Sequence, residues 1–125
     1  MTALAVEAEK LSSEQLAQTV NTNAVVVRRL LCELTHAGLV RTERGKRGGF
    51  LLAKPPRAIS LLDIYRAVLE DEAQDLVALH DNPENRKCPV SCKVRGALAT
   101  HLQKAQNVYE RELEKVMLTD IARAM

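Results

Sequence analysis

Positive charge concentrated in residues 21–53 constrains this chain most, because it indicates both a local fold and a kind of partner. Between residues 28 and 57 the sequence has eight Lys and Arg residues and only two acidic residues, Glu33 and Glu43. The whole chain has a net charge of only +2, so the remaining residues carry a net negative charge. Basicity confined to one segment indicates a surface for an acidic partner, such as a nucleic acid, and not a solubilising coat.

The first part of this segment has the periodicity of an amphipathic helix that begins near Asn23 and ends before Gly38. Its apolar residues recur with helical spacing and should form the buried side: Val27, Leu30, Leu31 and Leu34. The outward side should carry Val25, Arg29, Cys32 and His36, with Arg28 on its flank. Arginine donates paired hydrogen bonds to guanine, and a small aliphatic group contacts the thymine methyl, so this side suits readout of a major groove. The alternative is a solvated surface helix with two ordinary arginines.

A hairpin with a basic, glycine-rich tip is predicted directly after this helix. Gly38 suits the left-handed turn that ends a helix, and residues 39–43 and 50–52 have the composition of strands. Between them lie the tip residues Arg44, Gly45, Lys46, Arg47, Gly48 and Gly49. Glycine allows tight turns and close approach of the backbone to phosphate, while the cationic side chains supply charge. A helix followed by a basic hairpin predicts a winged helix-turn-helix that binds double-stranded DNA.

The residues before this segment supply the other helix of a helix-turn-helix. Ser12 followed by Gln15 has the pattern of a capping box, and the helix should run to about Val20. A short polar turn then leads to Thr22 and Asn23, either of which can cap the next helix and contact a phosphate. Residues 2–9 should be helical but too few to pack as a full first helix.

The second half of the chain predicts a helical extension. Ser60 and Asp63 begin a helix whose buried side should include Leu61, Ile64 and Val68. Residues 82–96 have the composition of a loop or a broken helix. A long helix should follow from Ala97 to about Leu118, with an apolar stripe of roughly 30 Å formed by Leu98, Leu102, Ala105, Tyr109, Leu113 and Val116.

A stripe of this length predicts a homodimer, because a small winged domain cannot cover it. Two-fold symmetry would match a palindromic operator. The alternative is a long helix that folds back on its own domain. The expected organisation is residues 1–58 as the winged helix-turn-helix and residues 59–125 as a helical linker, a cysteine loop and a dimerisation helix. The predicted fold class is mainly α with a small β-hairpin wing.

Composition narrows the class of protein further. Aromatic residues make up 2% of the 125 residues and Trp is absent, so aliphatic helix packing must form the core. No apolar run approaches the roughly 18 residues of a membrane span and no signal peptide is evident, so we expect a cytoplasmic protein without a membrane partner. The odd number of cysteines, three, agrees with a reducing compartment. No Ser/His/Asp set, full metal-ligand cluster or phosphate loop predicts an enzyme.

Four stretches together resemble the Rrf-two (Rrf2) family of bacterial winged-helix regulators: LSSEQLAQTVNTNAVVVRRLLCELTHAGLV, RGKRGGFLLAKPP, ISLLDIYRAV and CPVSC. This family includes cluster-sensing, nitric-oxide-sensing and cysteine-metabolism repressors. The resemblance implies a homodimeric repressor with the long C-terminal helix at its interface. It implies operator contacts from Val25, Arg28 and Arg29 and from the wing residues 44–49. The chain departs from the family in its shorter first helix, and its loop has two cysteines where cluster-binding members have three. It therefore looks closer to the branch without an obvious iron–sulfur cluster.

The two loop cysteines, Cys88 and Cys92, are candidate sensors. Four cationic neighbours, Arg86, Lys87, Lys93 and Arg95, favour the thiolate and hence reversible oxidation. Structural or inert cysteines are the first alternative. A metal or iron–sulfur cluster, with His80 or His101 as further ligands, is the second, although no cofactor is the favoured prediction. Cys32 should be inert.

A second class of function is a protein-interaction module. In that case the basic surface of the winged helix would bind an acidic protein. Salt dependence separates the two, because DNA binding weakens steeply with salt and retains a preference for one sequence over bulk DNA.

Overall fold

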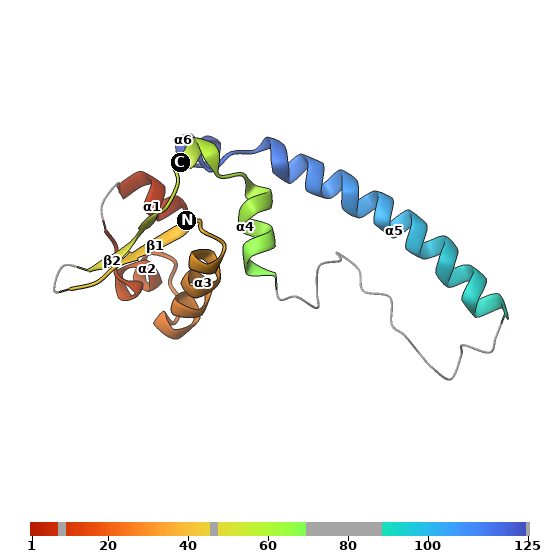
Figure 1. Ribbon diagram of the computed structural model, residues 1–125, viewed down its shortest axis with the longest axis horizontal. Coiled ribbons are helices and arrows are strands. Elements are labelled where there is room, and N and C mark those ends of the chain that lie inside the picture. Colours follow the sequence, from red (N-terminus) through yellow and green to blue (C-terminus); the bar gives the residue numbers. More distant parts are fainter. Residues whose placement is uncertain (8–9, 46–47, 70–88, 125) are drawn as a thin grey trace. The chain divides into compact units, whose positions relative to one another are not determined.

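The computed structural model describes residues 1–7, 10–45, 48–69 and 89–124. These ranges contain six α-helices, one short 3-10 helix and one antiparallel hairpin. The α-helices and strands are labelled in Figure 1. In chain order they are α1 (Thr2–Glu7), α2 (Ser13–Thr19), α3 (Ala24–His36), β1 (Val40–Glu43), β2 (Gly49–Leu52), η1 (Pro56–Ala58), α4 (Leu61–Val68), α5 (Pro89–Lys115) and α6 (Leu118–Arg123). The predicted class, mainly α with a small β-hairpin wing, is confirmed.

The chain forms two compact units. The first joins Met1–Val68 to Leu113–Met125, and the second is Leu69–Glu112. The first unit thus contains the helix-turn-helix, the hairpin, α4 and α6, while most of α5 belongs to the second. The functional division predicted at residue 58 stays a prediction. No helix in the described ranges is long and apolar enough to cross a membrane.

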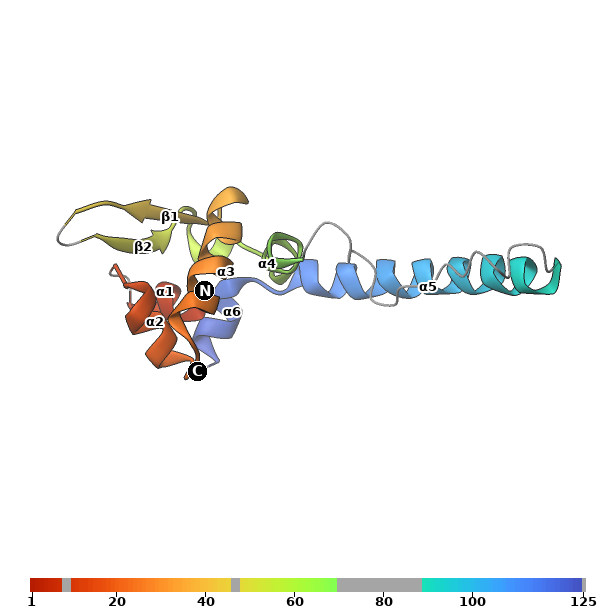
Figure 2. The ribbon, with the colours of Figure 1, turned by 90° about the horizontal axis from the view of Figure 1, so that it is seen from below.

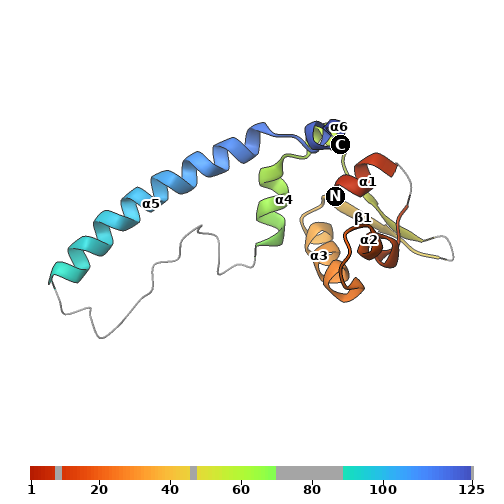
Figure 3. The same cartoon turned by 180° about the vertical axis from the view of Figure 1, so that it is seen from behind.

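The helix-turn-helix forms through the caps predicted from the sequence. Ser12 Oγ accepts a hydrogen bond from the backbone amide of Gln15 at 3.2 Å, and the side-chain oxygen Oε1 of Gln15 accepts one from the backbone amide of Ser12 at 2.8 Å. Asn23 Oδ1 accepts from the Val25 amide at 2.8 Å, so Asn23 and not Thr22 caps α3. These bonds fix where the two helices begin, and Figure 3 shows α2 and α3 beside each other.

The buried side of α3 differs from the predicted stripe at one residue. Val27, Leu31 and Leu34 are buried as predicted, but Leu30 is 38% exposed. The buried side is centred on Val27 and Leu31, and Ala24 also packs against the core on that side, so Leu30 lies at its edge. The buried side of α4 also differs from the prediction. Its buried residue is Leu62, and Val68, which was predicted to be buried, is exposed.

The cap of α4 is nevertheless the predicted one. The Ser60 amide and hydroxyl both donate to Asp63 Oδ2 at 2.9 Å. The Asp63 amide in turn donates to Ser60 Oγ at 3.1 Å. The first turn of α4 is therefore fixed by a reciprocal pair of side chains of the kind the sequence indicated.

The hairpin follows α3 as predicted, and Figure 2 shows its strands side by side. Gly38 leaves α3 with φ +69°, and β1 then pairs with β2 from Val40↔Leu52 to Glu43↔Gly49. A third segment, which no pattern in the sequence indicates, pairs with β2. The Leu11 amide donates to Phe50 O at 3.2 Å, and the Phe50 amide donates to Leu11 O at 2.9 Å. This backbone pairing holds Leu11, just before α2, against the wing.

The long helix begins earlier and ends earlier than predicted. α5 starts at Pro89, so the predicted loop or broken helix is wrong for residues 89–96, while residues 82–88 lie outside the described ranges. Proline suits a first helical position because its fixed φ matches the helix and no hydrogen bond is lost there. At the other end α5 stops at Lys115, so Val116 does not continue the stripe as predicted.

After α5 the chain pairs with the start of α4, which the sequence did not predict. The Leu61 amide donates to Val116 O at 2.9 Å, and the Leu118 amide donates to Ile59 O at 2.8 Å. Leu118 is 1% exposed, and α6 then packs against α1 and η1. α1 is as short as expected, yet it packs through its buried Leu4, and Figures 1 and 3 show α6 beside it.

Candidate nucleic-acid interface

The helix-turn-helix residues that were predicted from the sequence to contact DNA lie in the first turns of α3 and just before it. Thr22, Asn23, Val25 and Arg29 are all exposed, and Val25 is 65% exposed. This placement follows from the helical period, because burial of Val27 directs residues two positions before and after it away from the core. Val26, also exposed, was missed because β-branched residues in a run of three give no local sign of which one is buried.

Arg28 lies in the same turns but contacts α2. Its Nε donates to Ser13 Oγ at 3.1 Å, and its Nη2 forms an ion pair with a carboxylate oxygen of Glu14. Ser13 is buried, whereas the side chains of Arg28 and Glu14 are both more than half exposed. Sequence reasoning missed this pairing because it joins two helices across a turn. The guanidinium that was predicted to read bases is therefore directed toward the neighbouring helix.

The ionised form of Glu14 is stabilised by its position as well as by Arg28. A hydrogen bond from its own backbone amide in the first turn of α2, then the Arg28 guanidinium and the Ser13 hydroxyl, lower the pKa of Glu14 below its ordinary value of 4.5. These contacts therefore favour the ionised carboxylate. It places a negative charge at the N-terminus of α2, where the helix dipole stabilises it.

Lys10, which lies outside the hairpin in the sequence, contacts the wing. Its ammonium group forms an ion pair with Glu43, whose second carboxylate oxygen lies 3.8 Å from Arg41 Nη2. A hydrogen bond from Lys10 is the main reason that the pKa of Glu43 lies below its ordinary value. Sequence reasoning missed Lys10, which lies far from the hairpin in the chain. Glu43 is thereby neutralised beside the basic tip.

The predicted wing residues divide into surface and internal positions. Arg44 is exposed, and Gly45 has φ +118°. Lys46 and Arg47 lie outside the described residues. A Cβ on Gly48 would clash with the Glu43 carbonyl, and one on buried Gly49 would lie 3.0 Å from the Leu11 carbonyl oxygen. Internal backbone contacts thus explain both glycines without a contact to phosphate.

The predicted dimer stripe lies on α5 except for Val116. Leu98 and Ala105 are exposed, while Leu102, Tyr109 and Leu113 are partly exposed. Val94 and Val108, which were not predicted, add exposed apolar side chains on the same part of the helix. α5 thus carries apolar side chains that the described chain does not fully cover.

The candidate sensor and metal residues are only partly described. Cys92 lies in the first turn of α5, and nothing is described of its side chain; Cys88 and His80 lie outside the described residues. His101 and Cys32 are both exposed. Within the ranges described, no three His, Cys, Asp or Glu side chains are grouped to hold a metal ion. The predictions about a sensor and a cofactor therefore stay predictions.

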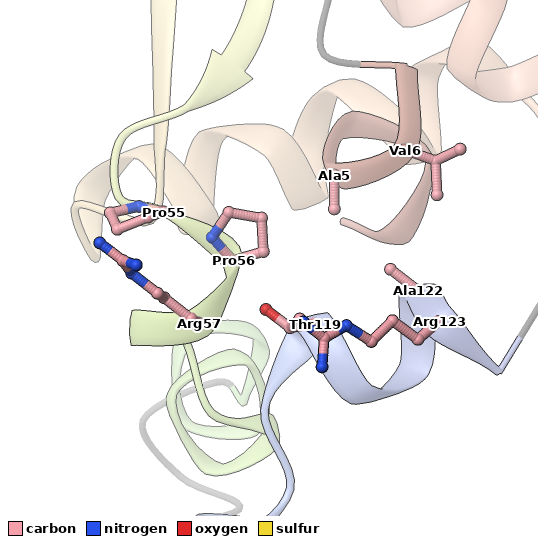
Figure 4. A pocket seen from close by; sticks show the side chains of 8 residues that line it. All are labelled: Ala5, Val6, Pro55, Pro56, Arg57, Thr119, Ala122 and Arg123. Atoms are coloured by element: carbon pink, nitrogen blue, oxygen red, sulfur yellow. The ribbon is translucent and has the colours of Figure 1, made fainter.

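A pocket in the first unit lies between α1, η1 and α6. Figure 4 shows its eight lining residues: Ala5, Val6, Pro55, Pro56, Arg57, Thr119, Ala122 and Arg123. Among the described residues that line it, most side chains are apolar, and the charged groups are two guanidiniums, those of Arg57 and Arg123. Its residues are separate from those at the start of α3 and in the wing.

Comparison with known proteins agrees with this geometry. The Rrf2 family model, described as an iron-dependent transcriptional regulator, matches residues 1–124. YwnA of Bacillus subtilis (strain 168), a proposed HTH-type transcriptional regulator, is 44% identical over 113 residues, covering 90% of this chain and 82% of YwnA. The HTH-type transcriptional repressor NsrR of Streptomyces coelicolor is 30% identical over 118 residues, covering 93% of this chain and 74% of NsrR.

The fold also resembles that of a solved structure. The crystal structure of a proposed DNA-binding protein matches with a TM-score of 0.77 and 38% identity, covering 96% of this chain and 90% of that one. The family and the relatives named above are transcriptional regulators and not enzymes, as predicted. The chain therefore belongs to the Rrf2 family of transcriptional regulators.

Proposed function

We propose that the chain is a sequence-specific repressor that binds a palindromic operator as a homodimer, with the start of α3 in the major groove. The observation that carries the proposal is the exposure of Val25 and Arg29 in the first turns of α3, a helix that is followed in the chain by a hairpin whose turn is basic in sequence. Placing the N-terminal turns of a second helix at the base edges is the docking geometry of a helix-turn-helix. Similarity to a repressor, NsrR, supports the direction of regulation.

Different residues would carry base readout and phosphate binding. Arg29 would donate paired hydrogen bonds to guanine, and Val25 would contact a thymine methyl. Thr22 and the amide group of Asn23 would contact phosphate and set the register of α3. In the wing, Arg44, Lys46 and Arg47 would neutralise phosphates, while Gly48 and Gly49 would maintain the shape of the hairpin.

Replacing Arg29 with Ala should weaken operator binding by about 1–3 kcal/mol, because a bidentate contact to one base would be lost. Binding to random duplex should weaken less. Fluorescence anisotropy at fixed salt measures both affinities. Arg123→Ala is the matched control, because it removes one exposed positive charge from the same unit but lies on α6. Equal losses on operator and random DNA would instead assign Arg29 to phosphate.

Replacing Arg44 with Ala should weaken binding to every duplex alike and reduce the salt slope of binding by about one unit, as one lost phosphate contact predicts. The measurement is log affinity against log salt concentration for the wild type and the variant. A slope that does not change, with sequence preference lost, would give the wing a role in base readout.

The proposed homodimer would form through α5. Val94, Leu98 and Val108 are each about half exposed, and a second copy of the helix would bury them against equivalent residues. Such a dimer would present two copies of α3 to the two halves of a palindrome. Sensing through Cys88 and Cys92, by oxidation or by a bound metal, would act on the dimer near the start of α5, and it stays a prediction.

A further inference from the structure

The pair of contacts between Arg28 and α2 assigns this arginine a role different from base readout. We propose that Arg28 is a positioning residue, which ties the first turns of α3 to the start of α2 so that Arg29 and Val25 enter the groove in register. The proposal rests on the proposed function, since it concerns how α3 is presented to operator DNA.

The first argument is the geometry of the guanidinium. Its Nε and Nη2 both donate toward α2, to Ser13 and to Glu14. These acceptors are adjacent residues in one helical turn, so the planar fork of the guanidinium is held at two points. These bonds occupy the Nε–Nη2 edge of the guanidinium, so a bidentate base contact through that edge would require both bonds to break.

The second argument is the charge around this contact. The N-terminus of a helix carries partial positive charge, so a guanidinium lying there unaided would be repelled. Glu14 stands in the first turn of α2 and supplies the opposite charge. The acceptor is therefore provided by the helix that Arg28 contacts, and the Ser13 hydroxyl beside it is buried. The arrangement joins α2 and α3 on the flank next to the outward side of α3.

The two possible roles of Arg28 predict opposite effects of one substitution. If Arg28 reads a base, Glu14 competes with DNA for it, and Glu14→Gln should increase the preference for operator over random duplex. If Arg28 positions α3, the same substitution should lower that preference. The ratio of the two affinities is the appropriate readout, because the added net positive charge strengthens binding to both duplexes.

The experiment compares the full-length wild type with Glu14→Gln, Arg28→Gln and the double variant, which has the net charge of the wild type. Anisotropy gives the affinity for the selected operator and for random duplex. We expect each single variant to lower the preference about twofold to fivefold, the range typical of an exposed ion pair. The double variant should be no worse than the worse single one, because both substitutions remove the same contact.

A second measurement separates positioning from a merely structural role. Operators with one base pair changed at a time should show that Arg28→Gln weakens preference at the base pairs affected by Arg29→Ala or by Val25→Ala and at no others. Preference lost at a separate base pair, an increased preference in Glu14→Gln, or ratios unchanged in every variant would each overturn the inference. A wild type without preference for any sequence would instead overturn the proposed function.

Discussion

Replacing Leu118 with Ala should lower the free energy of unfolding by about 2–5 kcal/mol, the usual effect of truncating a fully buried leucine. Leu118 is 1% exposed and packs into the core that contains Leu31 and Leu34 of α3. Its backbone amide, which Ala retains, donates to the Ile59 carbonyl, so the substitution removes only the side-chain packing where α6 docks. Urea denaturation followed by circular dichroism measures the change.

The matched control for this prediction is Ile121→Ala, also on α6. Ile121 is 36% exposed, so its truncation removes less buried surface and should cost clearly less than that of Leu118. Small and equal decreases in the free energy of unfolding for the two variants would contradict the docking of α6 on the winged unit. A large loss for Leu118 alone would agree with it.

Replacing Leu98 and Val108 together with Glu should convert the proposed dimer to monomers and weaken operator binding at least tenfold, which is about 1.4 kcal/mol. Leu98 is 48% and Val108 is 59% exposed in the single chain, so the charges can be solvated in a folded monomer. In a dimer the same charges would be buried without partners, which is costly. Analytical ultracentrifugation measures the assembly, and anisotropy measures binding.

The control substitutes Glu for Gln103 and Asn107, which are exposed and lie on another side of α5 by helical spacing. It adds the same charge to the same helix and should leave the dimer intact. A dimer that persists in the Leu98 and Val108 variant would place the interface elsewhere. Monomers that still bound the full palindrome tightly would contradict the two-fold arrangement.

Local signals explain why the helix-turn-helix could be predicted from the sequence. The Ser12–Gln15 capping box, the Asn23 cap and the left-handed Gly38 each act within a few residues, and each was confirmed. The outward position of Val25 and Arg29 follows from the helical period and the apolar residues between them. The fold of this part therefore needed no long-range information.

Contacts between distant residues could not be predicted in this way. The bridges Leu11↔Phe50 and Ser60↔Met117 are backbone pairings of segments too short to have a strand pattern. The contact of Arg28 with α2 depends on how two helices pack, and Arg28 and Glu14 look like ordinary surface charges in sequence. The composition of residues 82–96 predicted a loop or a broken helix, and it does not show that Pro89 stands at a first helical position, because that depends on where the helix begins.

Selection of bound fragments from random-sequence DNA tests the central claim most directly. A homodimer that reads two half-sites should enrich one inverted repeat with half-site centres one helical turn, about 34–36 Å, or a multiple of it apart. The selected duplex should bind two chains, at least a thousandfold more tightly than random duplex, as specific DNA-binding proteins do. The absence of any enriched sequence, or enrichment of one half-site bound by a single chain, would contradict the proposal.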